Sequence, residues 1–302
     1  MIYKELGRTG ERLPAIGLGT WKMPVDSRGA LAALREGFKL GARFVDTAEL
    51  YANEELVGRA IAGMEDIFVA TKVSPNHFHY DDVIRACEAS IKRLGVKSID
   101  LYQLHWPNHS IPISETMRAM EHLADSGRIR HIGVSNFSVD EMVEAQGSMR
   151  RYEIVSNQVE YSPLARSVED GIAEFCVREH LTLIAYSPLA RGHVFDERSK
   201  ANGVIKDIAA RHNRSVAQVV LNYIVSKEGC VAIPKAGSIR HVEENVGSTD
   251  FKLSKRDIES IDSISGYTRR PLAGKTLQAF LKSTGAWAGI LERIERGRRS
   301  GQ

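Results

Sequence analysis

The chain contains few cysteines and no long apolar segment. Cys87, Cys176 and Cys230 lie far apart in 302 residues, without C-x-x-C spacing, so the sequence predicts neither a disulfide framework nor a zinc knuckle. No run approaches the roughly eighteen apolar residues of a membrane-spanning helix. The first residues, Met-Ile-Tyr-Lys-Glu, lack the apolar core of a signal peptide. We therefore expect a cytoplasmic protein in a reducing compartment, without a membrane partner.

The nucleotide-binding patterns of two dehydrogenase classes are absent or out of place. A Rossmann domain requires G-x-G-x-x-G directly after a strand, but Lys22 occupies the position of the third glycine after Gly17 and Gly19. Tyr223 and Lys227 have the Y-x-x-x-K spacing of short-chain dehydrogenases, yet they lie in a helical stretch with no glycine loop. We interpret this as a chance match, with Tyr223 packed in the core.

The sequence also lacks a metal-ligand pattern and the basic charge distribution of a nucleic-acid-binding protein. His77 and His79 have the His-x-His spacing of metal-dependent hydrolase barrels, but no carboxylates follow at ligand spacing, so they predict a loop contact near a pocket and not a zinc site. The net charge of +3 is uneven: residues 267–302 carry eight Lys or Arg against two Glu, and the remaining chain carries 33 basic against 36 acidic residues. A mildly acidic body with a basic tail does not indicate nucleic-acid binding.

The composition and the order of elements are informative. With 43% hydrophobic and 26% charged residues, the chain resembles an ordinary globular protein. Short apolar runs alternate eight times with amphipathic helical stretches: runs 13–20, 44–47, 67–72, 99–105, 129–134, 154–159, 182–186 and 230–234, and helices 27–40, 54–62, 80–94, 114–126, 138–149, 168–180, 202–227 and 239–247. Eight such units in about 250 residues predict an α/β protein with a closed (β/α)8 TIM barrel, in preference to an open doubly wound sheet.

The two ends of the chain are expected to add to this barrel. Residues 1–12 predict a β-hairpin that turns at Gly7-Arg-Thr-Gly10 and covers one barrel end. After a capped helix that ends near Ser263, apolar residues recur at helical spacing in two segments broken near Gly285: Leu277, Phe280 and Leu281, then Trp287, Ile290, Leu291 and Ile294. We expect one barrel domain over 1–302, with the basic extension 267–302 packed on or near it, in a monomer or weak homo-oligomer. A subunit contact or a flap over the substrate site is the alternative for the tail.

Four proton-handling side chains stand at or near the ends of successive apolar runs. Asp46 comes near the end of the second run, Lys72 ends the third and His105 the fourth, and Tyr51 follows Asp46 in a loop. Catalytic groups of (β/α)8 barrels lie at the carboxyl ends of the strands, and adjacent strands are about 4.8 Å apart. The spacing therefore predicts one hydrogen-bonded cluster.

The residue types of this cluster indicate protonation of a carbonyl oxygen. A phenol has a pKa of about 10, and the ammonium group of Lys72 is expected to lower the pKa of Tyr51. Asp46 would keep a buried Lys72 charged, and a neutral His105 would orient a carbonyl oxygen beside the phenol. Singly, such residues are usually solvated charges or core residues. Their joint placement on successive strands favours catalysis.

Segments from Leu18 to about Asp262 resemble the aldo-keto reductase family. They are GLGTW (17–21), FVDTAELY (44–51), VATK (69–72), IDLYQLHWP (99–107), IGVSNF (132–137), NQVEYSP (157–163), IAYSPLARG (184–192) and IPKAGSIRHVEEN (233–245). The resemblance implies a (β/α)8 fold, a nicotinamide cofactor across the barrel mouth, and reversible reduction of aldehydes and ketones to alcohols. It also implies that Tyr51 is the general acid of a tetrad with Asp46, Lys72 and His105.

The resemblance further implies which side chains contact the ligands. The nicotinamide carboxamide would be held by Ser135, Asn136 and Gln158, and the ring would stack on Tyr186. The 187–192 loop would cover the pyrophosphate, with Ser187, Leu189, Arg191 and Gly192 as contacts. Other cofactor contacts would be Gly19, Thr20, Trp21 and Asp46, and, around the adenosine end, Lys235, Ser238, Arg240, His241, Glu244 and Asn245. Substrate would contact Trp21, Tyr51, His105 and Trp106.

One position departs from the family pattern. Family members that prefer the 2′-phosphate usually carry Arg six residues after the Lys of the IPK motif, here Lys235, but this chain has His241. Arg is a permanently charged bidentate phosphate ligand, whereas His is mostly neutral at pH 7. Lys235 and Arg240 remain as cations, so we expect use of NADP(H) or NAD(H), with the preference left open.

A non-enzymatic role is the main alternative. The chain also resembles the cytoplasmic β subunits of potassium channels, in which cofactor state serves regulation, and fold alone does not separate the two. The sequence has no long N-terminal extension and its tetrad is complete. These features favour an enzyme that acts on a small-molecule carbonyl or alcohol.

Overall fold

The computed structural model describes residues 1–264, 283, 285–294 and 296–297. The strands are β1 (Tyr3–Glu5), β2 (Arg12–Pro14), β3 (Leu18–Gly19), β4 (Phe44–Asp46), β5 (Phe68–Val73), β6 (Ile99–Leu104), β7 (Ile129–Ser135), β8 (Ile154–Glu160), β9 (Thr182–Tyr186) and β10 (Cys230–Ala232). The α-helices are α1 (Arg28–Lys39), α2 (Glu54–Ile61), α3 (Tyr80–Leu94), α4 (Ile113–Asp125), α5 (Val139–Gly147), α6 (Ile172–Arg178), α7 (Lys200–His212), α8 (Val216–Ser226), α9 (Ile239–Val246) and α10 (Lys255–Asp262). Short 3-10 turns are η1 (Glu49–Tyr51), η2 (Pro75–His77), η3 (Ser167–Glu169), η4 (Ala190–Phe195) and η5 (Gly247–Thr249).

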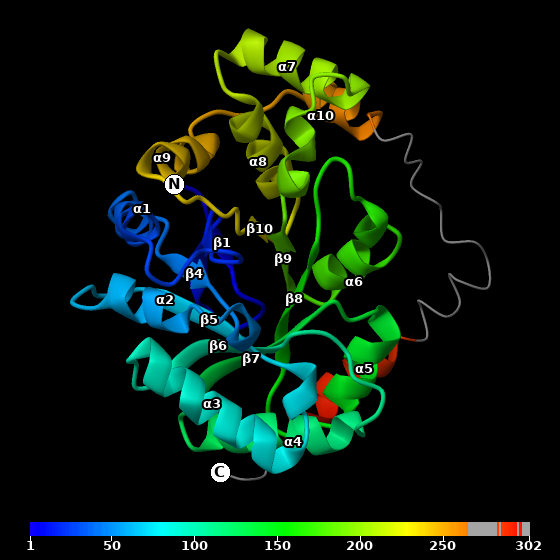
Figure 1. Cartoon of the computed structure of the whole chain (residues 1–302). Coiled ribbons are helices and arrows are strands. Elements are labelled where there is room, and N and C mark those ends of the chain that lie inside the picture. Colours follow the sequence, from blue (N-terminus) through cyan, green and yellow to red (C-terminus); the bar gives the residue numbers. More distant parts are fainter. Residues whose placement is uncertain (265–282, 284, 295, 298–302) are drawn as a thin grey trace.

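Strands β3 to β10 form one sheet of eight strands that follow one another in chain order. Each neighbouring pair is parallel. Parallel bridges from Ile16 to Ala232 and from Gly19 to Lys235 join the first segment to the last and close the ring. The helices surround the sheet on its outer face (Figure 1). The (β/α)8 prediction is therefore confirmed.

The N-terminal hairpin is confirmed, but the first predicted barrel run, 13–20, is wrong as a single strand. β1 and β2 pair antiparallel with Tyr3 opposite Pro14, and Gly7 and Gly10 have positive φ in the turn. The first part of this run pairs within the hairpin, where Ala15 N–H donates to the Ile2 carbonyl oxygen. The next part closes the barrel, where Gly17 N–H donates to the Ala232 carbonyl oxygen. The run is apolar because the hairpin and the last barrel segment both bury it. Only Leu18–Gly19 forms the barrel strand β3.

Serine side chains cap the N-termini of α1, α5, α7, α8, α9 and α10 by accepting a backbone N–H of the first turn. Helix α3 has the bounds that the periodicity predicts. The stretch predicted as a helix over 168–180 is shorter, because Gly171 at φ 122° separates η3 from α6.

The interior of the ring is apolar at the end that the hairpin covers. Leu6 and Leu13 are buried there with strand residues of the same cluster: Phe44, Ala70, Leu101, Val155, Ile184 and Val231. The hairpin is held to the start of β9 because Gly7 N–H donates to the Thr182 hydroxyl at 2.9 Å. This arrangement leaves the opposite end, where the strands finish, for the loops.

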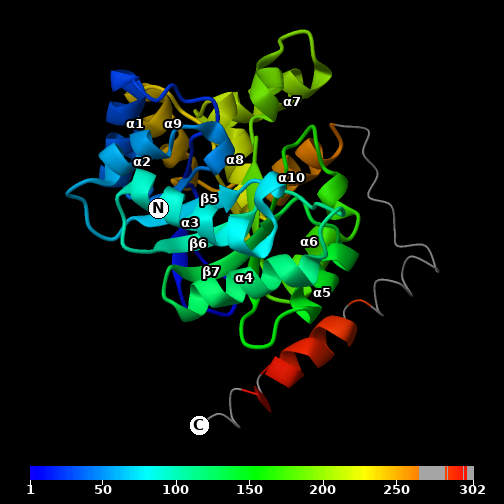
Figure 2. The same cartoon turned by 60° about the horizontal axis from the view of Figure 1, so that its bottom comes forward.

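The second apolar segment of the tail contacts α5 and α6. Residues 285–294 are helical, including Gly285, and run along the outside of the barrel beside α5 (Figure 2, red). The Trp287 ring is buried and meets the Phe175 ring edge-on at 5.3 Å between centroids. Ser283 Oγ donates to Asp140 at 2.9 Å. The first predicted segment, Leu277, Phe280 and Leu281, lies outside the described residues. Among the helices that the structure describes, none has the length and apolar character needed to cross a membrane.

Candidate active site

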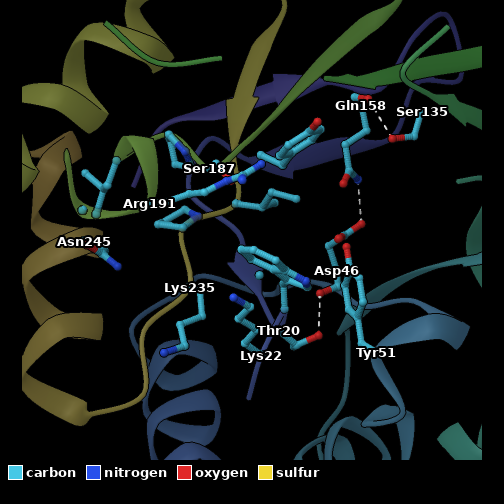
Figure 3. Close-up of a pocket in the computed structure, with 18 of the residues that line it drawn as sticks. Thr20, Lys22, Asp46, Tyr51, Ser135, Gln158, Ser187, Arg191, Lys235 and Asn245 are labelled. Atoms are coloured by element: carbon cyan, nitrogen blue, oxygen red, sulfur yellow. Dashed lines mark hydrogen bonds between the residues drawn. The ribbon is translucent and has the colours of Figure 1, made fainter. Parts of the chain in front are cut away.

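A cavity of about 1030 Å³ lies at the carboxyl ends of the barrel strands (Figure 3). It is lined by Gly19, Thr20, Trp21, Lys22, Asp46, Leu50, Tyr51, His105, Trp106, Ser135, Asn136, Gln158, Tyr186, Ser187, Pro188, Leu189, Arg191, Gly192, Phe195, Ala217, Ile233, Pro234, Lys235, His241, Glu244 and Asn245. Of the site residues inferred from the sequence, Lys72, Ser238 and Arg240 do not line it. The others come together around this one cavity.

Lys72 lies behind the cavity wall and is fully buried in β5. Its Nζ is 2.5 Å from Asp46 Oδ1, 2.8 Å from the Thr47 carbonyl oxygen and 3.5 Å from Tyr51 Oη. An ammonium group has three N–H donors, so these contacts use all of them. Burial lowers the pKa of Lys72, but its interactions with Asp46 and Tyr51 raise it more, and the net shift is upward. The interior of the barrel therefore holds a cation.

Asp46, the last residue of β4, is fully hydrogen-bonded in this interior. While Oδ1 faces Lys72, Oδ2 accepts from Gln158 Nε2 at 2.8 Å and from Gln103 Nε2 at 3.2 Å. Thr20 Oγ1 donates to the Asp46 backbone oxygen at 3.1 Å (Figure 3). A buried carboxylate is stable only with such partners, and the position of Lys72 is fixed by it.

Tyr51 ends the turn η1 and lines the cavity. The expectation that Lys72 lowers the pKa of Tyr51 holds for that one interaction, but burial has the larger effect. Burial raises the pKa of Tyr51, Lys72 lowers it, and Asp46 raises it again, so that the net pKa lies above its ordinary value of 10.0. The phenol thus keeps its proton at neutral pH.

His105 follows the last residue of β6 and lines the cavity next to Tyr51. The two rings lie 5.5 Å apart between centroids at 74°. Burial lowers the pKa of His105 to about 3, and the charge of Lys72 contributes in the same direction. The imidazole is therefore neutral at pH 7, as predicted. Its buried Nδ1 has no hydrogen-bond partner among the described residues.

Polar side chains on β7, β8 and β9 form a linked group on the next part of the wall. Ser135 Oγ donates to the Gln158 carbonyl at 2.8 Å (Figure 3). Asn136 Nδ2 donates to Ser135 Oγ at 3.0 Å, and the Tyr186 hydroxyl donates to Asn136 Oδ1 at 3.0 Å. The bonds of the Gln158 side chain to Asp46 and Gln103 use its amide nitrogen, which leaves Oε1 available as an acceptor.

The loop 187–192 crosses the cavity in a strained path. Ser187, Ala190 and Arg191 have φ of 49°, 47° and 53°, in the left-handed region, as does Gly192 at 96°. Arg191 lies 5.5 Å from the Trp21 ring centroid, and Lys22 Nζ lies 4.5 Å from the same centroid. Two cations on separate loops thus converge on one indole at the cavity edge.

The far end of the cavity is formed by the segment around α9. Lys235, His241, Glu244 and Asn245 line it, and Lys235 and Asn245 appear on this side in Figure 3. Ser238 caps the helix by accepting from His241 N–H. Arg240 is exposed and is not part of the lining.

Two other motifs lie outside the cavity. Tyr223 is buried in α8 and its hydroxyl donates to Asp262 at 2.5 Å, while Lys227 lies 4.4 Å from the Tyr223 ring. Neither lines the cavity, which agrees with core packing. His77 Nδ1 lies 2.7 Å from Glu49, and His79 Nδ1 lies 3.2 Å from Glu115; no metal-binding group of three or more ligand side chains occurs within the described part of the chain.

Sequence reasoning missed several residues of the site. Lys22, Leu50 and Phe195 line the cavity, and Gln103 supports Asp46 from inside the barrel. Asn53 joins the loops after β3 and β4, since its Nδ2 donates to the Thr20 carbonyl at 2.8 Å and its Oδ1 accepts from Thr47 Oγ1 at 2.9 Å. Gln103 carried a usable signal, because it is a polar residue inside an apolar run and two residues before His105.

The fold is a (β/α)8 barrel with its cavity at the carboxyl ends of the strands. Residues 15–266 match the model of the aldo/keto reductase family. A methylglyoxal reductase, YeaE, of Escherichia coli is 39% identical over 257 residues, which cover 83% of this chain and 90% of that protein. A glyoxal reductase of Bacillus subtilis is 36% identical over 260 residues, 85% of this chain and 90% of that protein. The chain belongs to the aldo/keto reductase family.

Solved structures agree with this assignment. A thermostable aldo-keto reductase in complex with the inhibitor epalrestat is 42% identical, with a TM-score of 0.82 over 87% of this chain and 100% of that one. An aldo/keto reductase of Klebsiella pneumoniae in complex with NADP and acetate is 35% identical, with a TM-score of 0.80 over 88% of this chain and 97% of that one. The protein is an oxidoreductase that uses NADP(H) or NAD(H).

Proposed function

We propose that Tyr51 is the general acid in a reduction of aldehydes and ketones to alcohols, with Lys72, Asp46 and His105 as its partners. The observation that carries this proposal is the contact series from Tyr51 Oη to Lys72 Nζ at 3.5 Å and on to Asp46 Oδ1 at 2.5 Å. The phenol is at the cavity wall, and the cation and the carboxylate are behind it. A proton donor backed by a cation is suited to protonating a carbonyl oxygen.

In the reduction, the O–H bond of Tyr51 breaks and its proton passes to the carbonyl oxygen. A nicotinamide cofactor held in the cavity would supply the hydride that the carbonyl carbon receives. Negative charge then develops on Oη, and the Lys72 ammonium at 3.5 Å stabilises this phenolate. Asp46 keeps Lys72 charged and oriented. In the opposite direction the phenolate accepts the proton of the alcohol.

His105 binds and orients the substrate oxygen. Its ring is neutral because its pKa is lowered to about 3, so one nitrogen carries a proton and the other does not. A neutral N–H donates to a carbonyl oxygen without transferring a proton to it. The edge-on position beside Tyr51 holds that oxygen within reach of the phenol.

The residues around the cavity fit a nicotinamide dinucleotide. The cavity has a volume of about 1030 Å³, at the upper end of the roughly 300–1,000 Å³ of small-molecule pockets. An extended ligand requires a cavity of this size. Gln158 Oε1 offers an acceptor for a carboxamide N–H, and Ser135 and Asn136 add polar groups beside it. Tyr186 would stack on the ring, and Lys235 and His241 would face the phosphates at the far end. Because His241 stands where a permanent cation would favour the 2′-phosphate, we propose that both NADPH and NADH are used.

The substrates that we propose are short 2-oxoaldehydes, such as methylglyoxal, together with apolar and aromatic aldehydes. The names of the E. coli and B. subtilis relatives support the first group. The cavity rim supports the second, because it holds large apolar side chains that are 41–47% exposed: Trp21, Leu50, Trp106 and Phe195. Such a rim provides apolar contact area for a carbonyl substituent.

Replacing Tyr51 by Phe tests the proposal. Following nicotinamide absorbance with methylglyoxal or an activated aromatic aldehyde, we expect Tyr51→Phe to lose about 10²–10⁴-fold in kcat with unchanged cofactor affinity. Equal rates in Tyr51→Phe and the parent would disprove the role of Tyr51. A parent that binds cofactor tightly but turns over no carbonyl would instead support a regulatory subunit of the potassium-channel β type.

A further inference from the structure

Tyr51 and Lys72 both lie beyond the residues that pair β4 with β5, although Lys72 still pairs with Gln103 of β6. β4 pairs with β5 from Phe44 opposite Phe68 to Asp46 opposite Ala70, and Thr47 N–H adds one bond to the Ala70 carbonyl at 2.9 Å. After that, the two segments continue without shared ladder bonds. The β5–β6 ladder places Lys72, but the position of the Tyr51 turn relative to β5 depends on contacts made after the β4–β5 ladder has ended.

Glu49 makes such a contact. It begins η1, the turn that ends at Tyr51, and its Oε2 accepts from Ser74 N–H at 2.9 Å. Ser74 is buried and follows β5, two residues after Lys72. Glu49 Oε1 lies 2.7 Å from His77 Nδ1, and the side chain is 17% exposed. Glu49 does not line the cavity, so any effect on chemistry acts through other residues.

We propose that Glu49 is a positioning residue for proton transfer. The hydrogen bond from Ser74 N–H to its carboxylate replaces the missing ladder bond, fixes the Tyr51 turn against the end of β5, and sets the separation of Tyr51 Oη and Lys72 Nζ. This inference rests on the proposed role of Tyr51. Removing the carboxylate leaves a buried N–H without its partner and releases the turn. A misplacement of about 1 Å in such a site costs about 100-fold in rate.

The chain contains a matched control for this carboxylate. Glu115 Oε1 accepts from Tyr80 N–H at 3.0 Å and lies 3.2 Å from His79 Nδ1. Each carboxylate thus accepts from a backbone N–H and lies beside an imidazole, although only His79 hydrogen-bonds to its carboxylate. Glu115 links the starts of α4 and α3 and does not touch the turn that carries Tyr51.

The first experiment compares aldehyde reduction by the parent, Glu49→Ala, Glu49→Gln and Glu115→Ala. We expect Glu49→Ala to lose about 10- to 100-fold in kcat with the KM for cofactor unchanged. Glu49→Gln keeps an oxygen acceptor for Ser74 N–H and should retain most of the parental kcat, and Glu115→Ala should match the parent. The proposal is overturned if Glu49→Ala matches the parent, or if a folded Glu49→Gln falls as far as Glu49→Ala. If Glu49→Ala does not fold, Glu49→Asp, which is shorter by one methylene, takes its place.

The second experiment does not depend on turnover. Carbon-13 labelling of the tyrosine ring gives an NMR titration of Tyr51, whose signal is identified by its loss in Tyr51→Phe. We expect the pKa of Tyr51 to be higher in Glu49→Ala than in the parent, because Lys72 is then held less closely and lowers it less. Equal pKa values would reject the positioning role. A parent without reductase activity would contradict the proposed function, and this titration would still decide the role of Glu49.

Discussion

The two ends of the barrel are built from the same strands but differ in what they bury. At the amino end, the hairpin residues Leu6 and Leu13 close the ring over an apolar interior that includes Phe44 and Val231. At the carboxyl end, the same ring holds Lys72 and Asp46 as a buried ion pair and opens into the cavity. Apolar burial stabilises the fold directly, whereas a buried ion pair contributes little net stability. The amino end of the barrel therefore contributes mainly to stability, and the carboxyl end carries the groups for chemistry.

Backbone conformation follows this division only in part. The hairpin turn uses glycines, Gly7 and Gly10, where φ is positive, and glycine adopts such conformations at no steric cost. Around the cavity, non-glycine residues take left-handed φ: Lys22, Asn136, Ser187 and Arg191. Each costs about 1 kcal/mol or more, and such residues cluster at functional sites. Asp66 and His180, which precede β5 and β9 at the amino end, also have positive φ, so left-handed side-chain-bearing residues are found in the cavity loops without being confined to them.

Replacing Lys72 by Met is the strongest test of this difference between the amino and carboxyl ends of the barrel. The change leaves Asp46 buried without its cation, and breaking a buried pair in this way costs about 3–5 kcal/mol of stability. Activity should fall as well, because no charge remains beside Tyr51 to stabilise the phenolate. Urea unfolding and aldehyde reduction measure the two effects.

A double variant separates the two consequences of Lys72→Met. In Asp46→Asn/Lys72→Met neither partner is charged, so we expect much of the lost stability to return. Activity should stay low. Recovery of activity together with stability would contradict a catalytic role for the pair.

At the amino end of the barrel, Leu13→Ala should lower stability and leave kcat unchanged. Leu13 is 1% exposed within the apolar cluster, and truncating a buried Leu costs about 2–5 kcal/mol of stability. At temperatures where the variant is folded, kcat should equal that of the parent, because Leu13 touches none of the cavity residues of the tetrad. Urea unfolding and steady-state kinetics on the same preparation check this. A loss of kcat in the folded variant would show that the two ends are coupled.

The sequence alone predicted the parts of this comparison that follow from periodicity. Strand ends were readable in the second, third and fourth runs, where Asp46, Lys72 and His105 follow apolar stretches, and Asp46 indeed ends β4. The run 13–20 failed because burial, not strand formation, makes it apolar: it serves the hairpin and the barrel closure in turn. Gln103 was overlooked although its place in a buried strand was a usable signal.

Other features depend on three-dimensional detail that no local pattern contains. Lys22 and Phe195 reach the cavity because of loop paths, and left-handed φ at a lysine or an arginine has no sequence signature comparable to glycine. The pKa of Tyr51 is a second case. The sequence named its charged neighbour correctly, but the net direction depends on the depth of burial, which exceeds the effect of Lys72.

Within the cavity, His241→Arg should change cofactor affinity and nothing else. Hydrogen bonds to charged groups contribute about 1.5–3 kcal/mol, so a bidentate arginine should tighten NADPH binding by about 10- to 100-fold and leave NADH binding nearly unchanged. Quenching of tryptophan fluorescence by each cofactor measures this without turnover. Arg240→Ala is the control, since Arg240 is exposed outside the cavity lining. A loss of NADPH affinity in Arg240→Ala equal to the gain in His241→Arg would mean that α9 presents a different face to the cofactor.

The smallest effect is expected from pH. Reduction requires a protonated Tyr51 and a neutral His105; the pKa of Tyr51 is raised above 10.0 and that of His105 is lowered to about 3. Neither group titrates between about pH 6 and 9, so kcat for reduction should be flat there and fall only as pH rises through the pKa of Tyr51. Alcohol oxidation requires the phenolate and should rise with pH over the alkaline range instead. If the pH profile for reduction shows a midpoint between pH 6 and 9, the effect of Lys72 on the pKa of Tyr51 outweighs the effect of burial once the cofactor is bound. The buried cation at the carboxyl end of the barrel would then set the acidity of Tyr51 as well as its position.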